Sequence, residues 1–156
     1  LYKTVGSCLA PFDSYLLIRG IKTLPIRMER QQENALAIAK WLQTQKKIKQ
    51  VYYIGLEDHP GYEINKKQTT GFGSMISIRT DSEATARRVL ERITYAESLG
   101  GVESLMTYPM LQTHGDVPVE TRERLGITED FLRFSVGIEN VDDLIADLDQ
   151  ALNGED

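Results

Sequence analysis

A long amphipathic pattern near the start of the chain most constrains how it can fold. Between about Thr23 and Gln45, apolar residues recur at spacings of three and four, which is typical of a helix with one buried face. These apolar residues are Leu24, Met28, Ala35, Ile38, Ala39 and Leu42. Thr23 and Pro25 are residue types that commonly begin a helix. The predicted helix is long enough to bridge two domains rather than only to cover one sheet.

The rest of the chain alternates short apolar runs with shorter helical patterns. Strands are predicted at 51–54, 75–79, 93–96, 104–108 and 132–136. Helices are predicted from Pro11, at 83–92 after the cap residues Asp81 and Ser82, at 119–125, and after Asn140. The polar stretches 57–71 and 111–118 are rich in turn residues and are predicted to be loops. This order favours an α/β fold of the α+β sandwich type, with a mostly antiparallel sheet and helices on one face.

Composition excludes several classes of function. The 156 residues suffice for one domain, and their net charge of −5 argues against a nucleic-acid partner. No apolar run approaches the roughly 20 residues that span a membrane. The single cysteine, Cys8, rules out an internal disulfide and fits a cytoplasmic protein. His59 and His114 lack companions at metal-ligand spacing, so no metal site is expected.

Two polar segments form the candidate site. The stretch 96–105 contains Glu97, Ser98 and a Gly-Gly pair, and the distant stretch 132–139 places Arg133 in a short apolar run. An arginine fork matches a carboxylate or a phosphate, and a hydroxyl can complete the cradle. Residue types alone leave a second interpretation open, in which these are an ordinary turn and a surface salt bridge.

Several spaced motifs together resemble one enzyme family over essentially the whole chain. They are Ala10-Pro-Phe-Asp-Ser-Tyr-Leu-Leu-Ile-Arg-Gly-Ile-Lys-Thr-Leu24, Arg27-Met-Glu-Arg30, Gly71-Phe-Gly73, Glu97-Ser-Leu-Gly-Gly-Val-Glu-Ser-Leu105, Thr113-His114 and Arg133-Phe-Ser-Val-Gly-Ile-Glu139. The chain resembles the pyridoxal-phosphate-dependent trans-sulfuration enzymes, the group of cystathionine β-lyase, γ-lyase and γ-synthase. The resemblance implies the C-terminal small domain of a fold-type I pyridoxal-phosphate-dependent transferase. Residues 1–46 would be linking helices from the cofactor domain, and residues 47–156 the substrate-side domain.

The same resemblance implies roles for individual residues. In the family, residues matching Ser98, Thr113 and Arg133 surround the α-carboxylate of the amino-acid substrate. Glu97 matches a position near the distal end of the substrate, although a solvated loop acid is the alternative. Leu99 follows Ser98 in the same motif and is counted with the substrate-binding residues. Family members are usually homotetramers.

The resemblance also implies a missing part. The family's cofactor lysine and phosphate-binding turn match nothing in this chain, so pyridoxal 5′-phosphate would be held by an N-terminal part, and this fragment alone would be inactive. Residues 107–118, with Gln112 before Thr113, look most like bacterial cystathionine β-lyases, which serve methionine biosynthesis and cysteine metabolism. Cystathionine γ-lyase and γ-synthase remain alternatives. So does a non-catalytic module that binds an amino acid or dimerises.

Overall fold

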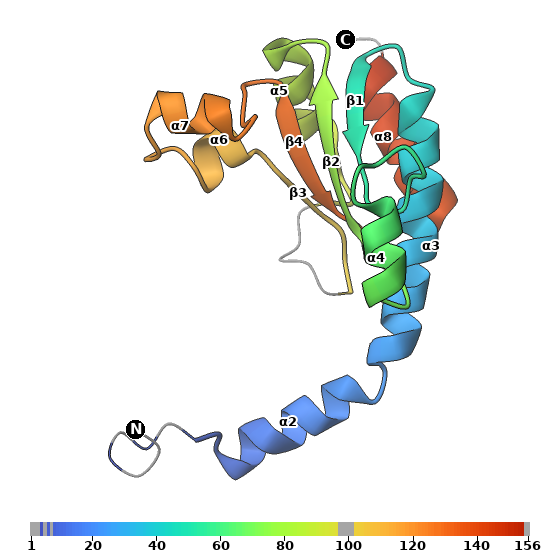
Figure 1. The fold of residues 1–156 in the computed structure, drawn as a ribbon. Coiled ribbons are helices and arrows are strands. Elements are labelled where there is room, and N and C mark those ends of the chain that lie inside the picture. Colours follow the sequence, from blue (N-terminus) through green and yellow to red (C-terminus); the bar gives the residue numbers. More distant parts are fainter. Residues whose placement is uncertain (1–3, 5, 7, 97–101, 155–156) are drawn as a thin grey trace.

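The computed structural model describes residues 4, 6, 8–96 and 102–154. Its helices and strands are α2 (Pro11–Ile21), α3 (Leu24–Gln43), β1 (Ile48–Tyr52), α4 (Tyr62–Gln68), β2 (Met75–Thr80), α5 (Glu83–Arg92), β3 (Leu105–Thr107), α6 (Pro109–Gln112), α7 (Val119–Arg124), β4 (Phe131–Ser135) and α8 (Val141–Asn153). Figure 1 shows α3, α5 and α8 gathered around the strands, while α2 projects away from them.

The four strands form one antiparallel sheet in the order β1-β2-β4-β3. Ile78 of β2 lies opposite Leu132 of β4, and Met106 of β3 lies opposite Phe134 of β4. Because neighbouring side chains along a strand point to opposite faces, these residues share one face, and all of them are buried. The predicted antiparallel sheet is confirmed.

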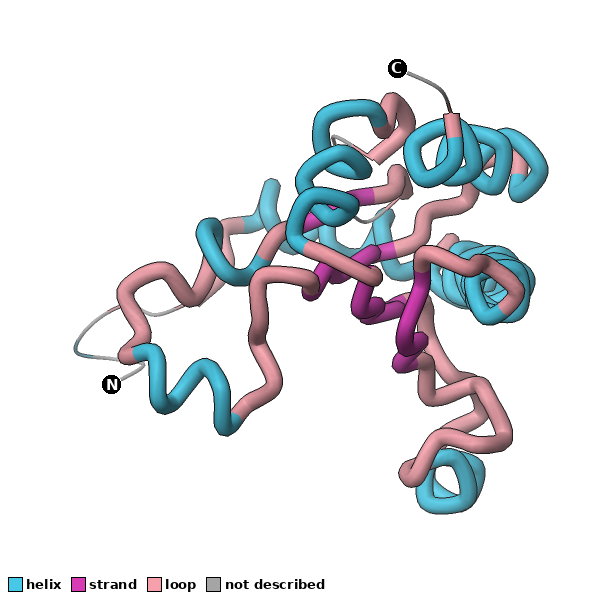
Figure 2. Tube along the Cα trace, turned by 90° about the horizontal axis from the view of Figure 1, so that it is seen from above, coloured by secondary structure: helices cyan, strands magenta, loops and turns pink. Residues whose placement is uncertain are grey.

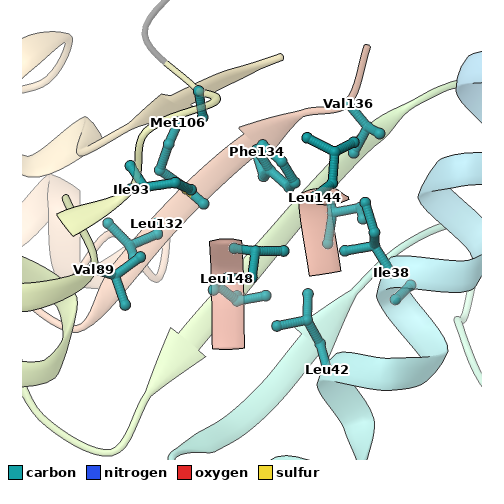
Figure 3. Packing of buried hydrophobic residues seen from close by; sticks show 14 of the residues in the cluster. Ile38, Leu42, Val89, Ile93, Met106, Leu132, Phe134, Val136, Leu144 and Leu148 are labelled. Atoms are coloured by element: carbon teal, nitrogen blue, oxygen red, sulfur yellow. The ribbon is translucent and has the colours of Figure 1, made fainter. Parts of the chain in front are cut away.

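Three helices cover this apolar face of the sheet (Figures 1 and 2). Helix α5 packs against β2 and β4, α3 packs against β1 and β2, and α8 packs against both helices. In Figure 3, Leu144 and Leu148 of α8 lie between Phe134 of the sheet and Ile38 and Leu42 of α3. The prediction of helices on one face is therefore also confirmed.

Only the C-terminal half of helix α3 contributes to this core. Ala35 and Ile38 are completely buried, as the predicted apolar stripe requires. Leu24 and Met28, from the same stripe, are each 41% exposed. The amphipathic pattern predicted that Leu24 and Met28 would be buried with the rest of the stripe, and this prediction is wrong. The N-terminal half of α3 extends beyond the sheet (Figure 1), so these two side chains are not covered by the described residues.

Helix α2 has no buried residue along its whole length. It begins at Pro11, as predicted, because proline lacks the N–H that a helix start leaves unpaired. Its large apolar side chains are all about half exposed or more, and they are Phe12, Tyr15, Leu16, Leu17, Ile18 and Ile21. Apolar side chains thus lie all around α2, and none of them is buried against another described element.

Two local predictions were wrong. Residues 62–68 form helix α4 rather than a loop, because tertiary contacts support this short helix. The ring of Tyr62 stacks on Phe72 with centroids 5.2 Å apart, and Asn65 Nδ2 donates to the carbonyl of Gly71. Residues 93–96 form no strand, because the backbone N–H groups of Thr94 and Tyr95 donate to a side chain of α8 instead of to a neighbouring strand.

Candidate functional site

Arg133 lies in the middle of β4, on the face of the sheet opposite α3, α5 and α8. Leu132 and Phe134 on either side of it point into the core and are at most 1% exposed, so alternation places Arg133 on the other face. We call this other face the second face of the sheet. The strand that the sequence predicted around Arg133 is confirmed, and it explains why the guanidinium stays outside the apolar core.

Two hydroxyl residues flank Arg133 on the second face. Thr107 of β3 and Ser77 of β2 lie directly opposite Arg133 in the two registers, so their side chains share its face. The Thr107 hydroxyl donates to the Arg133 carbonyl at 3.3 Å. Sequence reasoning missed both residues, although the alternation of apolar residues in their strands placed each of them on the side opposite the core.

The guanidinium of Arg133 has an unused donor. Its Nε is buried and has no hydrogen-bond partner among the described residues. A buried N–H without an acceptor costs about 1–3 kcal/mol, and more when the group is charged. The position therefore favours an acceptor that is supplied from outside the described residues, and a carboxylate matches the planar guanidinium fork.

Arg79 provides an internal comparison, since it lies two register positions away on β2. Its guanidinium donates to both carboxylate oxygens of Asp130 at 3.2–3.3 Å, and Lys49 lies 3.7 Å from the same carboxylate. Burial would raise the pKa of Asp130, but hydrogen bonds from Thr128 and Arg79 outweigh it and lower that pKa. Arg79 thus matches the salt-bridge interpretation, whereas the Nε of Arg133 does not.

Thr113 lies at the C-terminal end of α6, a short helix that packs against β4. Its hydroxyl shares a hydrogen bond of 2.7 Å with Nδ1 of His114, and it also approaches the carbonyl of Pro109 at 3.5 Å. The structure thus brings the element of Thr113 beside the strand of Arg133. A shared carboxylate cradle that includes both side chains stays a prediction.

Glu97, Ser98 and Leu99 lie outside the described residues. The chain just before them is held by the buried carboxylate of Asp147 on α8. This carboxylate accepts hydrogen bonds from the backbone N–H groups of Thr94 at 2.8 Å and Tyr95 at 2.9 Å, and from the Thr94 hydroxyl at 2.8 Å. Burial acts to raise the pKa of Asp147, but these hydrogen bonds outweigh it and lower that pKa.

Comparison with known proteins gives a consistent result. The family model for Cys/Met metabolism PLP-dependent enzymes matches residues 1–153. The chain is 50% identical to a cystathionine β-lyase of Coxiella burnetii over 97% of its own length, and 48% identical to a chloroplastic cystathionine β-lyase of Arabidopsis thaliana, also over 97%. A crystal structure of a cystathionine γ-synthase from Xanthomonas oryzae, in complex with cystathionine, is 42% identical, covers 93% of the chain and superposes with a TM-score of 0.85.

The chain belongs to the Cys/Met metabolism PLP-dependent enzyme family. Its fold is accordingly part of the fold-type I transferase fold, as the sequence predicted. The chain spans 40% of the length of the Coxiella relative, 33% of the Arabidopsis relative and 38% of the Xanthomonas γ-synthase chain.

The described lysines lie mostly at the surface. Every described lysine is exposed except Lys47, which is partly buried and donates to the carbonyl of Leu152. Within the described residues there is no group of three or more histidine, cysteine or acidic side chains arranged for a metal ion.

No helix in the described part of the chain combines the length and the apolar content that crossing a bilayer requires.

Proposed function

We propose that the whole protein is a pyridoxal-phosphate-dependent carbon–sulfur lyase that cleaves cystathionine to homocysteine, pyruvate and ammonia. The observation that carries this proposal is the 47–50% identity to cystathionine β-lyases from Coxiella burnetii, Lactococcus lactis and Arabidopsis thaliana, each over 97% of the chain. Such a β-lyase would serve methionine biosynthesis in the cytoplasm.

In this proposal Arg133 binds the α-carboxylate of the substrate. Its buried Nε supports the role, because a carboxylate would supply the acceptor that the described residues lack. Ser98 and Thr113 would donate hydroxyl hydrogen bonds to the same carboxylate, and Glu97 and Leu99 would contact the rest of the amino acid. Fixing the carboxylate orients the Cα–H bond for proton removal. Bound pyridoxal phosphate supplies the electron sink for that step.

The proposal also assigns the parts of the whole protein. Residues 47–156 would form the substrate-side domain, and residues 1–46 the helices that connect it to the cofactor domain. The lysine that holds the cofactor would lie in the portion of the relatives that this chain does not span. The complete enzyme would be a homotetramer, and the 156-residue chain alone would be inactive.

A cystathionine γ-lyase is the second candidate. A γ-lyase of Dictyostelium discoideum is 45% identical over 98% of the chain, only slightly below the β-lyases. The two activities break opposite carbon–sulfur bonds of the same substrate. Their products therefore differ.

The test is to identify the 2-oxo acid that the complete protein forms from cystathionine in the presence of pyridoxal phosphate. β-Cleavage releases pyruvate together with homocysteine, whereas γ-cleavage releases 2-oxobutyrate together with cysteine, and mass spectrometry separates the two pairs. We expect pyruvate and homocysteine. Predominant 2-oxobutyrate would favour the γ-lyase, and absence of both acids would refute lyase function. The 156-residue chain with added cofactor is the matched negative control.

A further inference from the structure

A buried polar network joins three distant segments just beyond the end of β4. Its centre is the carboxylate of Glu139, which accepts a hydrogen bond from the backbone N–H of Ser104 at 2.6 Å and from the Ser104 hydroxyl at 3.1 Å. The Ser104 hydroxyl in turn accepts from the backbone N–H of Gly137 at 2.9 Å. Ser104 is completely buried. Every polar group of its side chain and its backbone N–H is thus used.

Helix α3 closes the network from the other side. Asn34 of α3, only 2% exposed, donates through Nδ2 to the carbonyls of Gly137 at 3.1 Å and Glu139 at 2.9 Å. The backbone N–H of Ile138 donates to the carbonyl of Val102 at 2.9 Å. The network therefore ties residues 102–104 to the chain that leaves β4, and ties both to the long helix.

The packing around Gly137 leaves no space for a side chain. A Cβ at this position would lie 2.5 Å from the carbonyl oxygen of Val102 and 2.7 Å from the carbonyl carbon of Glu103, and it would also overlap the Glu139 carboxylate. Contacts this short do not occur, so only glycine lets the two segments approach each other. The close approach holds the Glu139 carboxylate against Ser104.

We propose that Glu139 is a positioning residue for substrate binding, an inference that rests on the proposed function. Ser104 immediately precedes β3, in which Thr107 lies opposite Arg133. By holding the N–H and the hydroxyl of Ser104, the carboxylate fixes where residues 102–104 enter the sheet relative to Arg133. A misplacement of about 1 Å in an active site can cost about 100-fold in rate, and a contact that binds substrate and transition state equally is lost as affinity, with kcat unchanged.

A carboxylate suits these two donors better than a neutral polar side chain does. Two donors of one residue approach its two oxygens, and hydrogen bonds to an ionised acceptor are about twice as strong as neutral ones. Glutamine keeps the length and one acceptor oxygen, so Glu139→Gln retains the bond to the Ser104 N–H. Its NH2 group can donate to the Ser104 hydroxyl only after that hydroxyl rotates, and both bonds lose the contribution of the charge. Alanine loses both.

The test measures the affinity of the complete, cofactor-loaded protein for cystathionine by calorimetry, together with KM and kcat. For Glu139→Ala we expect KM and Kd to rise by about tenfold while kcat changes by less than about threefold. Glu139→Gln should restore most of the loss. Glu63→Ala, which removes an exposed acid that pairs with Lys66, is the matched control and should leave all three constants unchanged.

Hydrogen exchange gives a readout that does not depend on turnover. In both Glu139 variants the amides of residues 102–106 should exchange faster than in the unmodified protein, and those of α5 should not. If Glu139→Ala exchanges faster there but binds cystathionine with unchanged Kd, the residue is only structural and the proposal is overturned. If the unmodified protein binds cystathionine but releases no 2-oxo acid, the lyase assignment fails while the Kd comparison still decides the role of Glu139.

Discussion

Replacing Asp147 by asparagine is the sharpest test of how the chain before residue 97 is held. The Asp147 side chain is 6% exposed and accepts four hydrogen bonds, the fourth from Gln150 Nε2 at 3.0 Å. The donors are divided between the two oxygens: the N–H groups of Thr94 and Tyr95 face Oδ2, and the Thr94 hydroxyl and Gln150 face Oδ1. Asparagine must place its NH2 group against one of these pairs.

The expected loss follows from that division. If the new NH2 group replaces Oδ1, the Thr94 hydroxyl can rotate to accept from it. Gln150 Nε2 also donates to the carbonyl of Arg92 at 2.7 Å, so its amide does not flip without losing that bond. One charge-assisted bond thus becomes a neutral one and another is lost. A hydrogen bond to a charged group contributes about 1.5–3 kcal/mol and one between neutral groups about 1 kcal/mol. Asp147→Asn should therefore lower the free energy of unfolding by about 2–5 kcal/mol at pH 7. Residue 149 offers a control, because Asp149 is exposed and bonds only to Asn153 on its own helix.

The pH dependence gives this prediction a second, independent signature. The pKa of Asp147 is lowered in the folded protein, while an unfolded aspartate titrates near about 3.9. An aspartate with a lowered pKa adds stability above the unfolded value, and that stability is lost as the pH falls through the folded pKa. The difference in unfolding free energy between the parent chain and Asp147→Asn should be constant from about pH 5 to 8 and should shrink below about pH 4.

Urea unfolding of the 156-residue chain, followed by far-ultraviolet circular dichroism at pH 7 and pH 3, measures both effects. Asp149→Asn should differ from the parent by less than about 0.5 kcal/mol. Equal stability of Asp147→Asn and the parent at pH 7 would refute the assigned role of the carboxylate. A difference that is the same at both pH values would refute its electrostatic origin.

Three further predictions concern the core, a buried phenol and the proposed site. Leu148→Ala truncates a side chain that is 1% exposed and should lower the free energy of unfolding in urea by about 2–5 kcal/mol. A decrease below about 1 kcal/mol would mean that the core shown in Figure 3 is not closely packed. Tyr53 donates to the Gly73 carbonyl at 2.9 Å, and burial raises its pKa to about 12. The free energy of unfolding should therefore fall between about pH 10 and pH 12. In urea titrations at alkaline pH, Tyr53→Phe should abolish that part of the fall. Arg133→Ala in the complete protein should weaken binding of cystathionine by about 2–5 kcal/mol in calorimetry, and unchanged binding would remove Arg133 from the site.

Elements with strong local signals were predictable from the sequence. Helix α8 begins after Asn140, whose side chain accepts from the backbone N–H of Asp142, and Leu144 and Leu148 lie in the core as their spacing predicted. Helix α5 likewise begins at the predicted cap Ser82. In these cases the cap and the apolar stripe act within a few residues of each other, so the sequence alone contains the information.

Where distant residues decide the structure, the sequence was not sufficient. Helix α4 depends on the stacking of Tyr62 on Phe72, and residues 93–96 are held by Asp147 rather than by a neighbouring strand. The network around Glu139 depends on Ser104 and Asn34, which are 35 and 105 residues away along the chain. Periodicity does not reveal such pairs. Only the spatial arrangement shows which acid meets which donor.

The same arrangement shows how three acids of this chain, whose net charge is −5, are paired within the fold. Asp130 is paired with Arg79, Asp147 holds the backbone at residues 94 and 95, and Glu139 holds Ser104. Each of these carboxylates already accepts two or more hydrogen bonds within the chain. A carboxylate that is saturated with fixed donors is a weak competitor for another cation, and the Nε of Arg133 has no partner among the described residues. Under the proposed function, that Nε would be free to meet the carboxylate of a substrate.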